Sequence, residues 1–256
     1  MTLQRSQVRV LYRPLYVLCM RTINITTIYE DNNLIVIDKP AGLLAHPVTD
    51  EKDTLIDLMK IKYPEAKLVH RLDKDTSGLM VIAKNEKTYE WLKSQFLNRQ
   101  IHKKYLALVN GILKDKKGVI AKSISKSRKR GGSQTIAPIG KMREALTRYE
   151  VIKEFSAKGG SASGGKNYTL LEVSPETGRT HQIRIHLASI GHPLAGDEKY
   201  KFKRQAKIDG LNRQFLHASY LQFQLLDGKI MEFRSELPEE LNKVLKKYDN
   251  QIGYIQ

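Results

Sequence analysis

The chain of 256 residues contains one cysteine and one tryptophan, and far fewer acidic than basic residues. Cys19 alone can form neither an internal disulfide nor a cysteine metal cluster. No run approaches the roughly 18 uninterrupted apolar residues of a membrane-spanning helix, and no basic amphipathic helix with a wide apolar face stands out. These absences argue against a disulfide-stapled domain and a membrane partner, so we expect a globular protein in the cytoplasm.

Several motifs of familiar chemistries are also missing. The sequence has no phosphate-binding Gly-x-x-x-x-Gly-Lys-Ser/Thr loop, no dinucleotide fingerprint after a strand and no His-Glu-x-x-His pair. His181, His186 and His192 lack the spacing of helical metal ligands. We therefore expect no metal and no nucleotide cofactor. Asp73 and Asp75 leave a glycosidase-like pair of carboxylates open, because spacing in sequence does not give their geometry.

Positive charge is what the sequence has in excess. Lys and Arg total 44 against 27 Asp and Glu, which gives a formal net charge of +17. A surplus of this size favours a polyanionic partner, with nucleic acid before any other. Residues 122–130 and 199–207 are basic stretches that could contact phosphates. The alternative for such a run is an ordinary solvated surface.

The pattern of apolar residues predicts one mixed α+β domain over residues 25–248. Short β-branched runs outnumber amphipathic stretches and do not alternate with them, so we expect a mostly antiparallel central sheet flanked by helices and loops. Residues 1–24 read as a poorly defined extension, because Arg13 and Pro14 interrupt their apolar run. Met20 is an alternative start, and we expect a monomer.

Individual elements follow from caps, breakers and periodicity. Helices are predicted at 53–63, begun by Asp53, at 85–97, begun by Asn85, at 181–190, begun by Thr177 or Thr180, and from Pro238 onward. Strands are predicted at 25–30, 34–38, 79–83, 105–109, 147–155, 168–174, 215–225 and 229–234. In the helix at 181–190, Arg184 and His181 share one face and Ile183 and Leu187 another.

The stretch from His70 to Gly78 holds a carboxylate in a constrained position. It is polar, ends in glycine and precedes the apolar run 79–83, which indicates a tight turn entering a buried strand. Asp73 would then lie near the end of a sheet, although an Asp-rich turn can also be only a turn. Arg184, on a helix that otherwise packs inward, needs a partner, because an unpaired buried guanidinium group is costly. An arginine beside Asp73 would lower the pKa of that carboxyl by about 1–3 units, and an ionised Asp can act as a nucleophile.

Two motifs carry a family resemblance. The stretches 70–78 (His-Arg-Leu-Asp-Lys-Asp-Thr-Ser-Gly) and 178–186 (Gly-Arg-Thr-His-Gln-Ile-Arg-Ile-His) resemble the diagnostic motifs of the RluA class of RNA pseudouridine synthases. Supporting stretches follow in the right order at 38–42, 104–109, 191–197 and 216–218. Together they span about residues 25 to 235, nearly the whole predicted domain.

The resemblance implies a site and a fold, the mixed α+β pseudouridine synthase fold. By this likeness Asp73 is the catalytic nucleophile, Arg184 pairs with it, and Tyr105 stacks against the target uracil. Four further residues match positions near the substrate: Arg71, which would help hold open the space left by a flipped nucleotide, and His181, Gln182 and Leu216. Asp75 is expected only to form the turn.

The implied reaction needs no cofactor. Isomerisation of uridine breaks the C1′–N1 bond, rotates the uracil and forms a C1′–C5 bond, after the base has left its stack. The substrate would be ribosomal or transfer RNA, and the sequence leaves open whether Asp73 attacks the ribose, attacks the base or assists elimination. We expect a member with only the catalytic domain. The alternatives are a non-catalytic RNA-binding or assembly protein, and a glycosidase that releases uracil.

Overall fold

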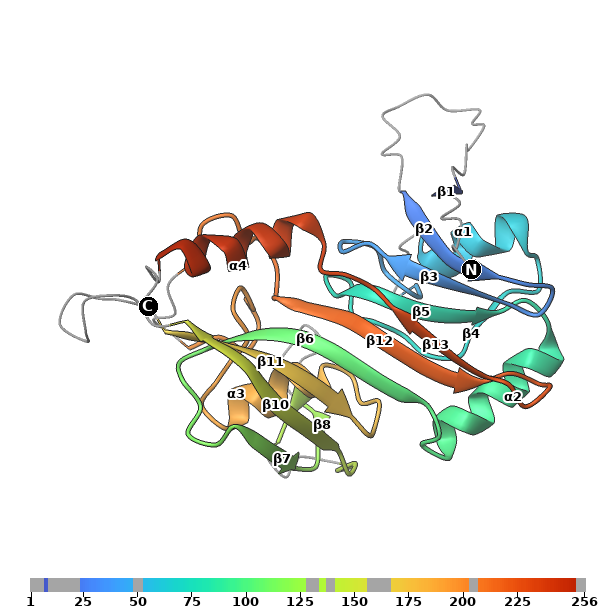
Figure 1. Ribbon diagram of the computed structural model, residues 1–256. Coiled ribbons are helices and arrows are strands. Elements are labelled where there is room, and N and C mark those ends of the chain that lie inside the picture. Colours follow the sequence, from blue (N-terminus) through green and yellow to red (C-terminus); the bar gives the residue numbers. More distant parts are fainter. Residues whose placement is uncertain are drawn as a thin grey trace. The chain divides into compact units, whose positions relative to one another are not determined.

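The computed structural model describes residues 7–8, 24–47, 53–127, 134–136, 141–155, 167–202 and 207–251 (Figure 1). Its contacts divide the chain into two compact units. Unit 1 comprises residues 1–101 and 221–235, and unit 2 comprises residues 102–220 and 236–256. Most of the predicted extension 1–24 lies outside the described residues, and the prediction of one domain over 25–248 stays a prediction.

Strands dominate unit 1 and pair side by side. The order β1, β2, β3, β5 is formed by β1 (Gln7–Val8), β2 (Ile25–Glu30), β3 (Leu34–Lys39) and β5 (Ser77–Ala83), and β4 (Lys67–Leu68) also pairs with β5. β13 (Ile230–Arg234) pairs with β12 (Leu216–Gln224). All pairings of described register within this unit are antiparallel.

The core of unit 1 forms because β3 and β5 are apolar on both faces. Every residue of β5 is buried, as a continuous apolar run predicts for a strand covered on both sides. The unit also contains α1 (Leu55–Lys62) and α2 (Glu86–Leu97), which begins at the predicted cap Asn85. Leu92 of α2 packs with Val81 of β5 and Phe223 of β12 in one cluster. Because all of β5 is buried, the loop 70–76 that leads into it is attached to a strand fixed in the core.

Unit 2 is a second antiparallel arrangement. Its strand order is β12, β6, β11, β10, β7, with β6 (His102–Asn110), β11 (Tyr168–Pro175), β10 (Leu146–Phe155) and β7 (Lys117–Ala121). β8 (Ser125–Lys126) and β9 (Gln134–Thr135) form a separate two-stranded sheet. Two helices complete the unit, α3 (Gln182–Ser189) and α4 (Glu239–Gln251).

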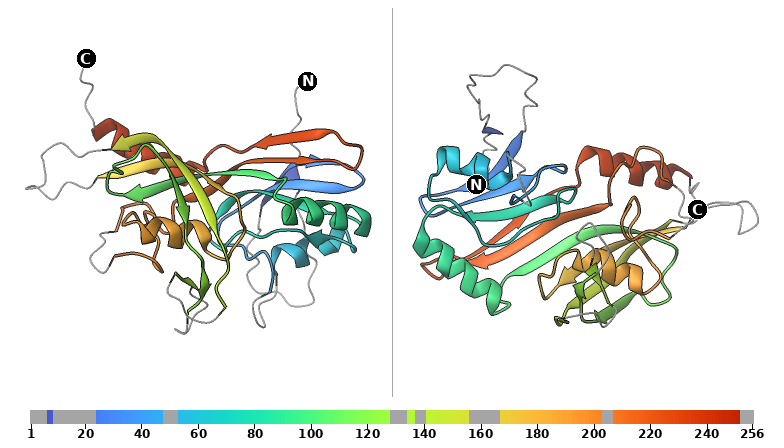
Figure 2. Two further views of the ribbon diagram at one scale, coloured as in Figure 1. Left: turned by 90° about the horizontal axis from the view of Figure 1, so that it is seen from below. Right: turned by 180° about the vertical axis from the view of Figure 1, so that it is seen from behind.

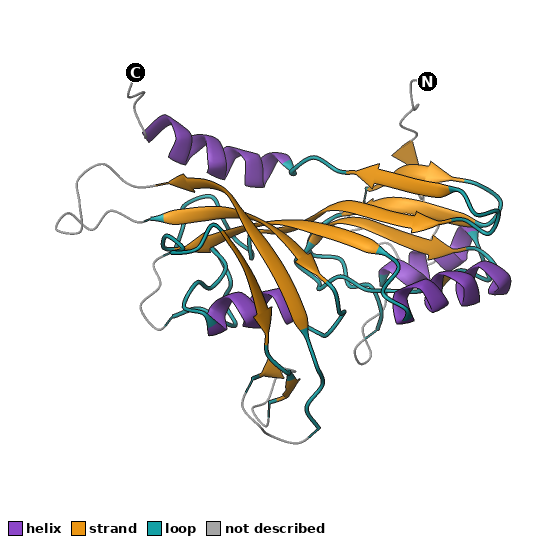
Figure 3. Ribbon diagram, turned by 60° about the horizontal axis from the view of Figure 1, so that its bottom comes forward, coloured by secondary structure: helices purple, strands orange, loops and turns teal. Residues whose placement is uncertain are grey.

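The two helices of unit 2 cover opposite faces of its strands (Figures 2 and 3). Successive side chains of a strand point to opposite faces, so Ala107 and Leu108 of β6 enter different clusters. The first cluster includes Ile183 and Leu187 of α3, and the second includes Leu241 of α4. Helix α3, which carries the second motif, is thereby fixed against the strands by its apolar face, as its periodicity predicts.

The structure confirms the α+β class and each of the eight predicted strands within two or three residues of its predicted ends. Two helix caps were predicted wrongly. Thr54 rather than Asp53 precedes α1, and its backbone N–H and hydroxyl both donate to Asp57 Oδ2, at 3.0 and 2.6 Å. His181, in a left-handed conformation, precedes α3 in place of Thr177 or Thr180. Thr177 is instead used as a buried hydrogen-bond partner of the Gln182 side chain at 2.6 Å.

No helix in the described part of the chain is both long and apolar enough to cross a membrane.

Candidate active site

Asp73 lies in a tight turn of unit 1 that enters β5. The N–H of Thr76 donates to the carbonyl oxygen of Asp73 at 3.1 Å, which closes a turn with Asp75 inside it. Leu72, on one side of Asp73, is buried, and so is Thr76 on the other, whereas Asp73 itself is half-buried. The backbone is thus held from both sides while Asp73 itself keeps part of its surface exposed. Asp75 occupies the turn position that the sequence predicts for it.

Lys39 fixes the same turn from within the core. Its side chain is fully buried, and its ammonium group donates to three carbonyl oxygens, those of Pro40 at 2.7 Å, Leu43 at 2.9 Å and Lys74 at 3.0 Å. An ammonium group has three N–H donors, and hydrogen bonds to a charged donor are stronger than neutral ones. The N–H of Gly42 donates to the same Lys74 carbonyl at 2.9 Å. Residues 39–43 are therefore tied to the residue next to Asp73.

A histidine anchors the start of the motif. His70 Nε2 accepts a hydrogen bond from the Val81 N–H of β5 at 3.0 Å, and its ring stacks on Phe96 of α2 with centroids 4.8 Å apart. Accepting at Nε2 requires that nitrogen to be deprotonated. The His70 side chain thus joins β5, α2 and the start of the motif 70–78. It fixes the backbone that leads to Asp73.

Arg184, in unit 2, forms a buried ion pair that the sequence did not identify. Its Nε and one terminal nitrogen donate to the two carboxylate oxygens of Asp197, at 2.7 and 2.9 Å. The Arg184 side chain is 9% exposed and that of Asp197 is fully buried. This two-point geometry fixes the plane of the guanidinium group. The prediction that Arg184 needs a partner is confirmed.

The carboxyl of Asp197 is held in its charged form. Burial acts to raise its pKa, but the hydrogen bonds and the charge of Arg184, together with the N–H groups of Lys199 and Tyr200, outweigh burial and lower the pKa below its usual value. Arg184 and Asp197 are thus both ionised at neutral pH. Because Asp73 belongs to unit 1, its predicted pairing with Arg184 stays a prediction.

Tyr200 joins the arginine to the start of α3. The Arg184 guanidinium lies 5.2 Å from the centre of the Tyr200 ring, within the range of a cation–π contact. The Tyr200 hydroxyl lies 2.9 Å from His181 Nδ1 and accepts from the Gln134 N–H at 2.8 Å. His181, predicted to lie near the substrate, is therefore part of the group of side chains around Arg184.

Gln182 is buried and fully used by the protein. Its Oε1 accepts from the Thr177 hydroxyl at 2.6 Å and from the Arg179 N–H at 3.0 Å. Its Nε2 donates to the carbonyl of Leu146 at 2.9 Å and the hydroxyl of Thr147 at 3.0 Å. These four bonds occupy all the positions that a glutamine amide offers. Gln182 fixes the turn before α3 against β10, and its predicted contact with substrate stays a prediction.

The remaining predicted site residues lie on both units. Tyr105, on β6, is half-buried and packs against the cluster that includes Ile183. Leu216, at the start of β12, is buried in the same cluster. Arg71 is exposed on the loop of Asp73. The structure thus brings Tyr105, Leu216 and the face of α3 together in unit 2, while Arg71 and Asp73 lie in unit 1.

Gly196 lets the loop before Asp197 pass close to another backbone. Its φ is +73°, and an added Cβ would lie 2.1 Å from the carbonyl oxygen of Arg213. Leu211, in the same segment, would also be in conflict, at 2.9 Å. Only glycine fits here without a shift of the main chain. The contact of Asp197 with Arg184 therefore depends on the absence of a side chain at the neighbouring residue, Gly196.

Asp197, Tyr200 and Lys39 are the residues that sequence reasoning missed. Asp197 ends the motif-like loop 191–197, and a buried arginine nearby is a signal that could have led to it. In the sequence, Tyr200 lies within the basic stretch 199–207, and Lys39 lies within the supporting stretch 38–42. Among the described residues, no group of three or more His, Cys, Asp or Glu is placed to hold a metal ion.

Comparison with known proteins decides the family. A model of the family described as RNA pseudouridylate synthase matches residues 33–189. The chain belongs to this family. It is 35% identical over 229 residues to the uncharacterized RNA pseudouridine synthase YlyB of Bacillus subtilis, which covers 85% of this chain and 71% of that protein. The resemblance to RluA-class enzymes, isomerases that act on uridines of RNA, is thereby confirmed.

Other members of the family agree with this assignment. Ribosomal large subunit pseudouridine synthase C of Haemophilus influenzae is 34% identical over 227 residues, covering 86% of this chain and 67% of that protein. Among solved structures, human RNA pseudouridylate synthase domain containing 4 is 26% identical, with a TM-score of 0.67 over 87% of this chain and 92% of that one. The structure of human RNA pseudouridylate synthase domain containing 1, which is 24% identical with a TM-score of 0.70, shows the same fold.

The role of Lys39 is tested by Lys39→Met, which keeps most of the side-chain volume and removes the ammonium group. The carbonyl oxygens of Pro40, Leu43 and Lys74 would each lose a charged donor, and the Lys74 carbonyl would keep the N–H of Gly42 as a donor, so we expect the free energy of unfolding to fall by about 2 kcal/mol or more in urea titrations. Lys74→Met removes the same charge from an exposed position in the same loop and should change stability by less than about 0.5 kcal/mol. Equal losses in the two variants would contradict the anchoring role.

The Arg184–Asp197 pair is tested by Asp197→Asn. This variant removes the negative charge that two bonds from the buried guanidinium group of Arg184 contact, and it should lose about 3 kcal/mol at pH 7. The native pKa of Asp197 is depressed, so its stabilising effect is complete above the unfolded pKa and disappears as pH falls through the native one. The wild-type advantage in urea unfolding should therefore shrink below about pH 4.

Asp209→Asn is the matched control, because Asp209 forms an exposed pair with Lys247 at 2.8 Å in the same unit. Such pairs contribute little, so this variant should unfold like the wild type at pH 7. A loss at Asp197→Asn that is no larger than that of the control, or that persists unchanged at low pH, would refute the role assigned to the buried pair.

Proposed function

We propose that this protein isomerises uridine to pseudouridine in the RNA of the large ribosomal subunit, with Asp73 as the catalytic residue. The family membership supports the reaction, and the names of relatives such as ribosomal large subunit pseudouridine synthase C and D support the substrate. The observation that carries the proposal is the anchored, half-buried Asp73 in the motif 70–78. Without tight anchoring of its loop, a carboxylate could not meet a sugar or base carbon in a reactive geometry.

Arg184 and Tyr105 are proposed to act on the same uridine, Arg184 as the counterion of Asp73 and Tyr105 as the stacking platform. The motif resemblance supports this joint action, and the structure supports it within unit 2 through the contacts that Asp197 and Tyr200 make with Arg184. Asp197 and Tyr200 are positioning residues in this proposal, since each acts through the guanidinium group. Tyr105 offers an aromatic face of the kind on which unpaired bases stack.

The net charge of +17 suits the binding of an RNA backbone, which is anionic. Extracting a nucleotide from its stack costs a few kcal/mol, which contacts to the RNA backbone offset. We propose Arg71 as the group that occupies the space of the extruded nucleotide, because it is exposed and two residues from Asp73. The basic stretches 122–130 and 199–207 are proposed backbone contacts, and residues 128–130 and 203–206 of them lie outside the described residues.

The function is tested with ribosomal and transfer RNA from cells that lack the gene. Purified wild type and Asp73→Asn are each added to this RNA, and the pseudouridines formed are mapped. The purified wild type should modify large-subunit ribosomal RNA. Asp73→Asn should be slower by at least about a thousand-fold, because it removes the reacting group, and should bind the same RNA with unchanged affinity. Asp75→Asn, the same change two residues away in the same turn, should keep its activity.

The outcomes separate the alternatives. Wild-type protein that binds RNA and leaves every uridine unmodified would indicate a binding or assembly protein. Release of free uracil would indicate a glycosidase, and modification confined to transfer RNA would contradict the proposed substrate. Full activity of Asp73→Asn would overturn the assignment of the catalytic residue while leaving the reaction in place.

A further inference from the structure

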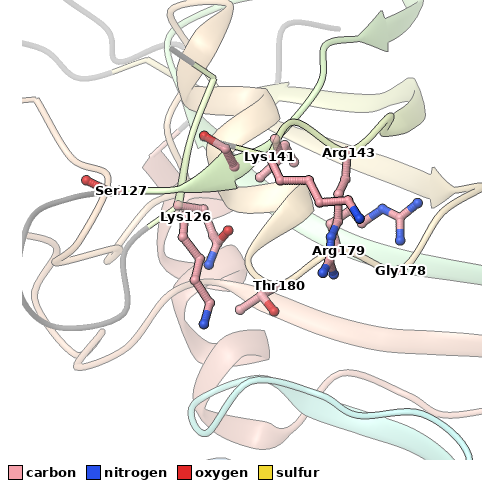
Figure 4. Close-up of a pocket in the computed structure, with 10 residues that line it drawn as sticks. Lys126, Ser127, Lys141, Arg143, Gly178, Arg179 and Thr180 are labelled. Carbon is pink, nitrogen blue, oxygen red and sulfur yellow. The ribbon is translucent and has the colours of Figure 1, made fainter. Parts of the chain in front are cut away.

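Unit 2 contains a cavity of about 600 Å³ that the catalytic assignment does not use (Figure 4). This size lies in the usual range for a binding site. The residues that line it share a polar or basic character: Ser125, Lys126, Ser127, Gln134, Lys141, Arg143, Gly178, Arg179 and Thr180, with Ile124 as the apolar member. None of them is acidic. As far as the structure describes its lining, the cavity therefore presents charge of one sign only.

Four of the lining residues are cationic: Lys126, Lys141, Arg143 and Arg179. Figure 4 shows the nitrogen ends of Lys141, Arg143 and Arg179 gathered at one side, with Lys126 on another wall. Within the described residues, none of the four forms an ion pair, and the chain from 126 to 141 has no Asp or Glu. Like charges in a concavity repel one another and raise the local potential. Binding of an anion would relieve this repulsion.

The walls of the cavity are fixed by backbone and buried contacts. Arg143 and Ile124 exchange backbone hydrogen bonds of 2.8 and 2.9 Å, and Ile124 is buried. Arg179 donates through Nε to the Glu144 carbonyl at 3.0 Å, and its N–H is held by the buried Gln182. Cations whose backbone is already in place lose less entropy when a ligand binds. The site is thus built in advance of its ligand.

The cavity adjoins the group of side chains around Arg184. Gln134, which lines the cavity, donates its N–H to the Tyr200 hydroxyl, and the Tyr200 ring contacts Arg184. Thr180, on another wall, is followed by His181, which also lies within hydrogen-bond distance of the Tyr200 hydroxyl. A ligand in this cavity would therefore lie beside the residues that orient Arg184.

We propose that this cavity binds a backbone phosphate of the substrate RNA, next to the nucleotide that enters the catalytic site. The inference rests on the proposed function. Guanidinium groups match the geometry of phosphate oxygens at two points, and lysines add charge, so two arginines and two lysines suit a phosphodiester. A contact of this kind fixes the register of the strand without reading its sequence.

The test uses Lys141→Gln and Arg143→Gln in the full chain, because both residues are exposed and their side chains can be changed with little effect on the fold. Lys243→Gln is the control, a cation on α4, which covers the opposite face of the strands. The two changes are also combined in the double variant Lys141→Gln/Arg143→Gln, and thermal unfolding checks that this variant, the two single variants and the control are folded. Binding of fluorescein-labelled single-stranded oligouridine is then measured at a series of KCl concentrations.

We expect the dissociation constant of the double variant Lys141→Gln/Arg143→Gln to rise about ten-fold at physiological salt. The slope of log affinity against log salt should become shallower by about 0.7 for each phosphate that the variant no longer neutralises. With ribosomal RNA as substrate, KM should rise and kcat at saturation should stay within about three-fold, because the cavity binds backbone that does not react. Lys243→Gln should match the wild type in all three measurements.

Other results overturn the proposal. If the double variant keeps the wild-type affinity and salt slope, the cavity does not bind the RNA backbone. If inorganic phosphate binds to the wild type and not to the double variant while RNA affinity is unchanged, the cavity is a site for a small anion. Failure of the proposed function is distinguishable, since the wild type would then form no pseudouridine while the variants still differed from it in binding.

Discussion

The buried ion pair of Arg184 and Asp197 is the interaction that joins α3 to the loop after it. A guanidinium on an inward-facing helix needs a counterion, and Asp197, at the end of the loop 191–197, supplies one. That loop also sets the N–H groups of Lys199 and Tyr200 on the same carboxylate. One charge requirement therefore organises α3, the loop after it and the aromatic ring that faces the arginine.

Unit 1 solves a similar problem with a different group. Backbone carbonyl groups of the loop that carries Asp73 lie close to the core. A buried carbonyl oxygen needs a hydrogen-bond donor. Lys39 supplies that donor from the end of β3, with all three of its N–H groups on carbonyl oxygens. In unit 1 a cationic side chain thus holds the main chain next to Asp73, whereas in unit 2 the carboxylate of Asp197 holds both Arg184 and the backbone N–H groups of Lys199 and Tyr200.

The sequence was most informative where a pattern repeats and least informative where a single contact decides. The strands at 25–30, 79–83 and 168–174 follow from alternating or continuous apolar residues. The two-residue strands β8 and β9 have no period to read, and β7 is partly exposed, with a lysine and a glycine at its start. The need of Arg184 for a partner was predictable, but the choice of Asp197 depends on the path of a loop.

Gly196 shows how the site depends on a position that carries no chemistry. The main chain of residues 196 and 213 can approach each other there only because no Cβ intervenes. Almost any change of this codon would push the loop away from Arg184 and remove the counterion without altering a charged residue. In a set of natural variants, loss of function at position 196 would therefore begin as a steric conflict and would reach the charged pair only through the displaced loop.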